Sequence, residues 1–262
     1  MKIGVSTGCL FPMLTEDALK TLVYNGFDTF EIFFNTFSEL EEDYLVRLKY
    51  FLDKHNARVS SVHPFTSSYE SSLFFSAYER RFYDGLSFYE MYFRTAKFLG
   101  VDKVILHGAK CDIPSNVSDK EYYRRFDMIQ QRANEYGVWL LQENVYNFRS
   151  NRIEFVKNMI DEIPQSAAFV CDLKQLHMAE IPYEDMIRTM GKHLRHIHIS
   201  DYSQGNKCLL PGKGEYDFKN FFRLLYDLGF DDDIIIEVYR FSYNTLKELC
   251  ESKEYLENKQ EG

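Results

Sequence analysis

The chain has 262 residues and a formal net charge of −9, with 45% hydrophobic and 16% aromatic residues. This length fits two small domains or one large one, and the apolar content suffices for a sizeable core, which excludes a disordered or fibrous chain. The acidic balance argues against a general binder of nucleic-acid phosphates, because such proteins normally present a basic face.

Five cysteines without CxxC spacing favour neither a disulfide framework nor a zinc ribbon. They fit a reducing cytoplasm. Turn residues interrupt the N-terminal segment before a signal-like stretch develops, and the sequence has no run of about 18 apolar residues. We therefore expect a cytoplasmic protein without a membrane or export role.

The predicted elements alternate between strands and helices. A strand over residues 2–7 precedes a helix capped by Thr15 and stopped at Gly26, while residues 65–77 and 110–118 read as loops. Gly100 and Gly137 precede later strands. The other strands are expected at 30–34, 58–64, 102–107, 138–143, 168–172, 195–200 and 233–238, and the other helices at 38–55, up to 99, up to 136, 153–163, 183–191, 218–228 and 243–256.

These elements form eight strand–helix units of about 30 residues each. This is the period of a closed eightfold barrel, and no remaining segment is large enough for a second domain. The sequence therefore predicts an α/β protein whose residues 1–262 form one single-domain (β/α)₈ TIM barrel.

The segment 195–201 alternates polar side chains with isoleucine. One face of the predicted strand carries His196, His198 and Ser200, and the other carries Ile197 and Ile199. A single buried imidazole is usually a hydrogen-bonded core residue, whereas three polar groups on one face indicate a wet or metal-binding cavity.

Three further strands end in a carboxylate, at Glu143, Asp172 and Glu237. Burying a carboxylate costs several kcal/mol unless it is paired or coordinated, and a shared cation would satisfy all three. With His198 they are separated by 29, 26 and 39 residues, so each comes from a different strand and all meet at the barrel mouth. Three carboxylates and one imidazole favour Mn²⁺ or Mg²⁺, with Co²⁺ and Zn²⁺ as alternatives.

Several short fragments at strand ends or in the following loops recur in the same order in a known superfamily. They are His63-Pro64, His107-Gly108, Gln142-Glu143-Asn144, Asp172-Leu173-Lys174-Gln175, the segment 196–201, Pro211-Gly212-Lys213-Gly214 and Glu237. Over essentially its whole length the chain resembles the xylose-isomerase-like TIM-barrel superfamily, in particular its sugar (phosphate) isomerase/epimerase branch.

The resemblance implies that one divalent metal is bound by Glu143, Asp172, His198 and Glu237, and that Glu143 and Glu237 also form the acid/base pair. Sugar isomerisation or epimerisation removes a proton next to a carbonyl, and a metal stabilises the resulting enediolate while carboxylates move the proton. A small-molecule carbohydrate is the expected partner, and relatives often pair into homo-oligomers.

Other residues at the rim are candidates for substrate binding. Lys174 either reaches a substrate oxygen or is a solvated helix-start lysine. His63 and His107 divide between substrate hydrogen bonding and a second metal, with a structural role a close third. Gln175 stands where many epimerases have a histidine, and its amide can hydrogen-bond a hydroxyl but cannot act as acid or base.

The superfamily's abasic-site endonucleases use three zinc ions, and here two of their ligand regions differ. Gln175 replaces one histidine, and Asn206-Lys207-Cys208 replaces an Asp-x-His motif, which disfavours a full trinuclear site and a zinc phosphodiesterase. An inosose-type dehydratase and a non-catalytic sugar-binding barrel also remain open.

Several site residues have plainer interpretations. Asp172 can be a helix N-cap, and the Gly212–Gly214 segment a turn rather than a phosphate contact. Asp201 is expected to orient a metal ligand, His196 to pack or bond inside the barrel, and Glu31 to pair there with a neighbour.

Overall fold

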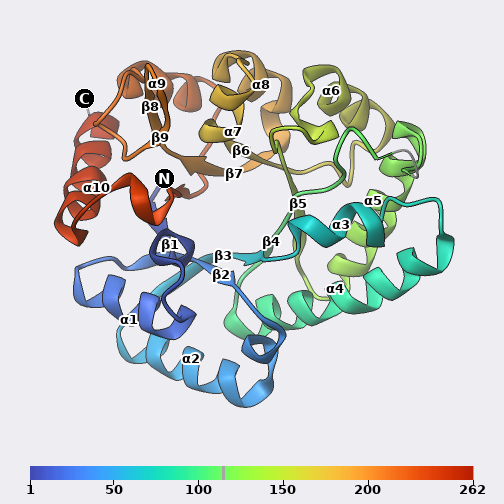
Figure 1. Cartoon of the computed structure of the whole chain (residues 1–262), viewed down its shortest axis with the longest axis horizontal. Coiled ribbons are helices and arrows are strands. Elements are labelled where there is room, and N and C mark those ends of the chain that lie inside the picture. The colour runs from blue at the N-terminus through green and yellow to red at the C-terminus, as the bar shows by residue number, and fades with distance from the viewer. Residues whose placement is uncertain (114–115, 262) are drawn as a thin grey trace.

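Eight parallel strands close into a barrel in the computed structural model, which describes residues 1–113 and 116–261. Neighbouring strands follow the order β1-β10-β7-β6-β5-β4-β3-β2, and β2 pairs with β1 to complete the ring. Figure 1 shows the helices arranged around these strands. The barrel strands are β1 (Ile3–Ser6), β2 (Thr29–Phe34), β3 (Arg58–Pro64), β4 (Lys103–Leu106), β5 (Trp139–Glu143), β6 (Phe169–Asp172), β7 (Leu194–Ile199) and β10 (Ile234–Ile236).

The helices up to α9 lie in the connections between successive barrel strands, as crossovers between parallel strands require, and α10 follows the last strand. They are α1 (Thr15–Tyr24), α2 (Glu42–Lys54), α3 (Ser67–Leu73), α4 (Glu79–Leu99), α5 (Asp119–Asn134), α6 (Ile153–Glu162), α7 (Leu173–Met178), α8 (Tyr183–Met190), α9 (Phe218–Asp227) and α10 (Leu246–Glu261). The predicted eightfold barrel is thus confirmed. Among the described residues, no helix has both the length and the apolar character that a membrane span needs.

The core has two layers because side chains alternate along each strand. Outward-facing residues such as Ile197 and Ile199 pack under the helices in the main core, whereas Ile105, Leu141 and Val170 belong to a separate small cluster. Period-two alternation places Leu141 on the same face of β5 as Glu143. The small apolar cluster therefore fills the barrel interior one layer below the polar residues at the carboxyl ends of the strands.

At the amino ends of the strands, an ion pair links β3 to the segment that enters β10. Asp233 accepts hydrogen bonds from Arg58 Nη2 and Ser60 Oγ, both at 2.7 Å. Asp233 is largely buried, so these contacts compensate for removing its carboxylate from water.

The structure differs from the predictions in the connections. Residues 65–77, expected as a loop, contain α3, and the short α7 and the hairpin of β8 (Asp201–Ser203) and β9 (Asn206–Leu209) were not predicted. Thr15 does not cap α1; Leu14 takes that position, while Thr15 Oγ1 donates to Phe33 O. Gly100 ends α4 with φ of 75°, as expected. The predicted loop 110–118 includes residues 114 and 115, which lie outside the described residues.

Candidate metal centre

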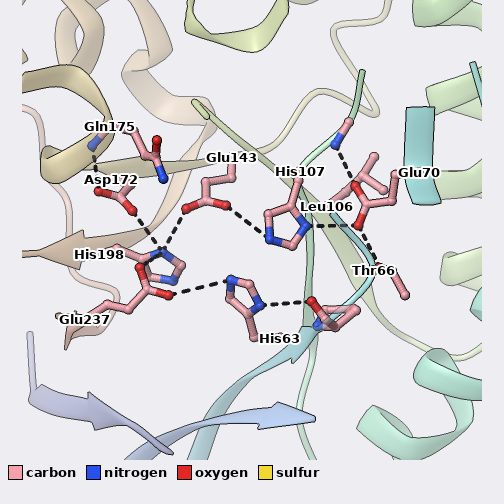
Figure 2. Close-up of polar contacts among 12 residues, drawn as sticks. His63, Thr66, Glu70, Leu106, His107, Glu143, Asp172, Gln175, His198 and Glu237 are labelled. Carbon is pink, nitrogen blue, oxygen red and sulfur yellow. Dashed lines mark hydrogen bonds and ion pairs between the residues drawn. The ribbon is translucent and has the colours of Figure 1, made fainter. Parts of the chain in front are cut away.

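Four adjacent strands bring the predicted ligands together at the barrel mouth. Glu143 ends β5, Asp172 ends β6, His198 is the penultimate residue of β7, and Glu237 directly follows β10. One ligand atom from each lies within 4.8 Å of the others. Figure 2 shows the three carboxylates directed at the imidazole of His198.

His198 Nδ1 lies at the centre of this cluster. It is 3.3 Å from Glu143 Oε1, 3.5 Å from Glu237 Oε2 and 3.9 Å from Asp172 Oδ2. Asp172 divides its oxygens between two tasks, because Oδ1 accepts from Gln175 N and so caps α7, while buried Oδ2 has no hydrogen-bond partner. The N-cap interpretation and the ligand interpretation of Asp172 are therefore compatible.

The cluster holds more negative than positive groups, and the pKa values of Asp172 and His198 are both shifted. Burial raises the pKa of Asp172 to about 8, although the nearby Lys174 ammonium opposes the shift. Burial alone would lower the pKa of His198, but the surrounding carboxylates, led by Glu31, raise it well above its usual value. A divalent cation would supply the missing charge and take the open oxygen of Asp172, so the residues present fit a metal.

Glu31 holds the far side of the His198 ring. Its Oε2 accepts from His198 Nε2 at 2.9 Å and from Ser61 Oγ at 2.8 Å. The carboxylate of Glu31 therefore favours a proton on Nε2, while Nδ1 faces the other three carboxylates and could bind a metal there, which is the usual carboxylate–histidine–metal arrangement. Glu31 thus pairs inside the barrel as expected, and His196 also bonds there, with Nε2 3.1 Å from Ser61 Oγ.

Two further imidazoles lie beside the first cluster. His107 Nε2 is 3.8 Å from Glu143 Oε2, and His63 Nε2 is 3.8 Å from Glu237 Oε1. Ligand atoms of His63, His107 and Glu143 also lie within 4.8 Å of one another. Glu143 therefore faces two sets of ligands, one through each oxygen.

Glu70 on α3 was missed in the sequence because residues 65–77 read as a loop. It is fully buried, and its carboxylate accepts from His107 Nδ1 at 2.9 Å and from Gly108 N at 2.6 Å. Thr66 Oγ1 and Tyr89 Oη donate to the same carboxylate. Although burial opposes it, the pairing with Glu70 raises the pKa of His107 to about 9. Glu70 thereby fixes the ring of His107 with Nε2 toward the mouth (Figure 2).

Lys174 and Gln175, both candidates for substrate binding, lie in different surroundings. Lys174 is buried, not solvated, and its Nζ lies 2.9 Å from Glu237 Oε2 and 3.4 Å from Asp172 Oδ2. Gln175 Oε1 accepts from Tyr146 N at 2.9 Å, so its amide oxygen binds the loop after β5.

Asp201 holds a loop and does not orient a metal ligand, contrary to expectation. Its carboxylate accepts from the backbone N–H groups of Tyr202, Gly212, Gly214 and Tyr216. A Cβ on Gly214 would lie 2.5 Å from Asp201 Oδ1, so the close approach requires glycine. These contacts agree with the turn interpretation of the segment.

A cavity of about 430 Å³ opens beside the cluster and gives access to it. Glu237 and Lys174 are its charged lining residues. The other lining side chains are mostly aromatic: Phe11, Phe33, Phe65 and Tyr239, together with Gly8, Asn35 and Val238. A mostly apolar pocket with a few convergent polar groups is typical of a small-molecule site.

A closed parallel barrel with polar side chains converging at the carboxyl ends of its strands defines the TIM-barrel class with a site at its mouth. The family model of the xylose isomerase-like TIM barrel matches residues 19–259. The chain therefore belongs to the xylose isomerase-like TIM barrel family. No curated protein matches its sequence.

Solved structures with the same fold cover nearly the whole chain. A D-tagatose 3-epimerase-like protein has a TM-score of 0.82 at 21% identity, covering 100% of this chain and 97% of its own. The 3-keto-D-glucoside 4-epimerase YcjR from E. coli has a TM-score of 0.79 at 19% identity, covering 98% and 99%. The IOLI protein with a bound zinc atom has a TM-score of 0.80 at 18% identity, covering 99% and 98%.

Proposed function

We propose that the protein is a divalent-metal-dependent isomerase or epimerase that acts on a sugar or sugar phosphate by removing a proton next to a carbonyl. The observation that carries the proposal is the convergence of Glu143, Asp172, His198 and Glu237 within 4.8 Å. Family membership and the sugar epimerases among the similar structures support it.

These four residues would hold the metal. Mn²⁺ and Mg²⁺ suit an oxygen-rich ligand set best, and the zinc atom in the IOLI structure keeps Zn²⁺ an alternative beside Co²⁺. A bound divalent cation would supply the positive charge that stabilises the oxyanion of the deprotonated substrate.

We assign the proton transfers to Glu143 and Glu237. Glu237 lines the cavity, and although burial opposes it, Lys174 Nζ at 2.9 Å lowers the pKa of this carboxyl, so Glu237 is ionised and able to act as a base before the metal binds. Glu143 lies between His198 and His107 and is the candidate to return a proton on the opposite face.

The remaining rim residues are assigned to the substrate. His63 and His107 direct Nε2 toward the two catalytic carboxylates and would hydrogen-bond substrate oxygens, as would Lys174 and the amide of Gln175. A second metal on His63, His107 and Glu143 is the alternative role of the imidazoles, and metal stoichiometry decides between them.

The test is proton exchange at carbon. Mn²⁺-loaded protein is incubated in deuterated water with ketohexoses, with ketopentoses and with their phosphates, and NMR follows carbon-bound hydrogens. We expect exchange next to the carbonyl, and Glu237→Gln is expected to reduce its rate by about 10²-fold or more. Glu42→Gln, at an exposed position on α2, is the matched control. A purified protein without metal whose Glu237→Gln variant keeps full activity would contradict the proposal.

Exchange, product mass and metal stoichiometry together separate the alternatives. An inosose-type dehydratase would remove the same kind of proton but expel a hydroxyl, so its product loses the mass of water. A zinc phosphodiesterase would retain more than one tightly bound zinc, which the His63–His107–Glu143 set allows and Gln175 disfavours. A non-catalytic sugar-binding barrel would bind a sugar without exchange.

A further inference from the structure

Lys174 lies inside the cluster of metal ligands. It occupies the first turn of α7, two residues after Asp172, and only 5% of its surface is exposed. Its Nζ is 2.9 Å from Glu237 Oε2 and 3.4 Å from Asp172 Oδ2. A buried ammonium is stable only when it is paired, so these carboxylates are what hold it there.

The two oxygens that contact Lys174 are also those that face the centre of the cluster. Glu237 Oε2 and Asp172 Oδ2 lie 3.5 and 3.9 Å from His198 Nδ1. In the part of the chain that the structure describes, no other lysine or arginine forms an ion pair with a ligand carboxylate. A metal ion and this ammonium would therefore compete for the same oxygens and repel each other.

We propose that Lys174 is a built-in counterion of the metal centre, which pairs with Glu237 and contacts Asp172 while the ion is absent and gives way when a divalent cation binds. This inference rests on the metal site of the proposed function. Lys174 then makes metal binding weaker than the four ligands alone would give, so the cofactor is exchangeable.

The ring of Tyr239 offers an alternative position for the displaced ammonium of Lys174. Lys174 Nζ already lies 5.0 Å from the centroid of the Tyr239 ring, a cation–π distance, and both residues line the cavity beside the cluster. Moving toward this ring keeps the charge paired with an aromatic face and brings Nζ to the space where the substrate binds. Metal binding would thus release the lysine for the substrate contact assigned to it above.

The test is the affinity of metal-free protein for Mn²⁺, measured by competition with a chelating indicator. Lys174→Met keeps the aliphatic stem and removes the charge, so we expect Mn²⁺ to bind about tenfold more tightly or better. Lys174→Arg keeps the charge and is expected to stay within about threefold of the wild type. Lys110→Met makes the same charge change at an exposed position with Nζ over the Phe148 ring, and is expected to leave the affinity unchanged.

Thermal stability gives a second readout that does not depend on turnover. Lys174→Met leaves the carboxylates of Glu237 and Asp172 without their ammonium, so its loss of Tm should be larger in chelator than in saturating Mn²⁺. If the variant does not survive metal removal, it is purified with Mn²⁺ and the rate of Mn²⁺ release to excess chelator is compared with the wild type. Slower release supports the inference, and equal or faster release overturns it.

The outcomes separate this inference from the proposed function. Tight Mn²⁺ binding by the wild type with equal or weaker binding by Lys174→Met overturns the counterion role and leaves the metal site standing. Failure of both proteins to bind Mn²⁺ overturns the two proposals together.

Discussion

His198 is held from both sides of its ring, by Glu31 at Nε2 and by the ligand carboxylates around Nδ1. The carboxylate of Glu31 is fully buried and is also fixed by Ser61 Oγ. Such a partner sets both the tautomer and the basicity of a metal-binding imidazole, so we expect the affinity of the proposed metal centre to depend on Glu31, which is not one of the four proposed ligands.

Glu31→Gln tests this dependence. The amide keeps one acceptor for His198 Nε2 but removes the negative charge, so Mn²⁺ affinity is expected to fall by about tenfold or more. The measurement is the same indicator competition, and Glu42→Gln is the exposed control. An unchanged affinity would mean that Glu31 acts in packing alone.

The sequence predicted that Glu143, Asp172, His198 and Glu237 converge, but not the residues that hold them in place. Glu143, Asp172 and Glu237 stand out because each closes an apolar strand, which is a local pattern. Glu31 was recognised as a barrel acid, but its contact with His198 joins β2 to β7 across the interior, and no local pattern encodes that distance. Glu70 was missed because its function depends on where α3 packs.

At the scale of elements, the short connections were the least predictable. The strands were found because each is an apolar run bounded by turn residues. Helix α3 is the serine-rich segment Ser67–Leu73 and has little intrinsic helix propensity, but the contacts of buried Glu70 hold it. Helix α7 begins directly after β6, so no polar linker marks where the strand pattern ends and the helix pattern begins.

The ion pair below β10 gives a pH dependence that can be measured. Burial would raise the pKa of Asp233, but the hydrogen bonds from Arg58 and Ser60 hold it below its ordinary value of 3.8. A carboxyl with a lowered pKa stabilises the fold above its ordinary pKa, and this stabilisation is lost as the pH falls through the lowered value.

Asp233→Asn is therefore expected to lose about 1 kcal/mol of unfolding free energy at neutral pH. The difference from the wild type should shrink as the pH falls below 3.8. Urea unfolding at a series of pH values measures it, with the exposed neighbour Asp231→Asn as the control. A difference that stays constant with pH would show that the carboxylate charge is not the cause.

At the scale of the whole molecule, the proposed metal would join four strands that are neighbours in the barrel. The ligands come from β5, β6, β7 and β10, which follow one another in the ring. A cation bound there would connect half of the barrel wall, so its binding should stabilise the entire fold. The assignment of residues 1–262 to one domain, the cytoplasmic location and a homo-oligomeric state stay predictions.

Saturating Mn²⁺ is accordingly expected to raise the Tm over that in chelator. At a hundredfold excess over Kd the gain is about 2.7 kcal/mol, or roughly 5–10 °C for a chain of this size. Asp172→Asn should reduce this shift, because asparagine can still cap α7 but lacks the ligand charge. Differential scanning fluorimetry measures the Tm shift of the wild type and of Asp172→Asn. Equal shifts in the two proteins would mean that the ion binds elsewhere.

The ring closes through β1 and β10, whose registered pairs include Ile3 with Ile234 and Val5 with Ile236. Of the barrel strands, β1 is therefore synthesised before the others, but both of its edges are covered only after β10 has been made. Until then the nascent chain exposes unpaired strand edges, which promote aggregation. Synthesis of this protein should therefore depend on chaperones until residue 236 has left the exit tunnel.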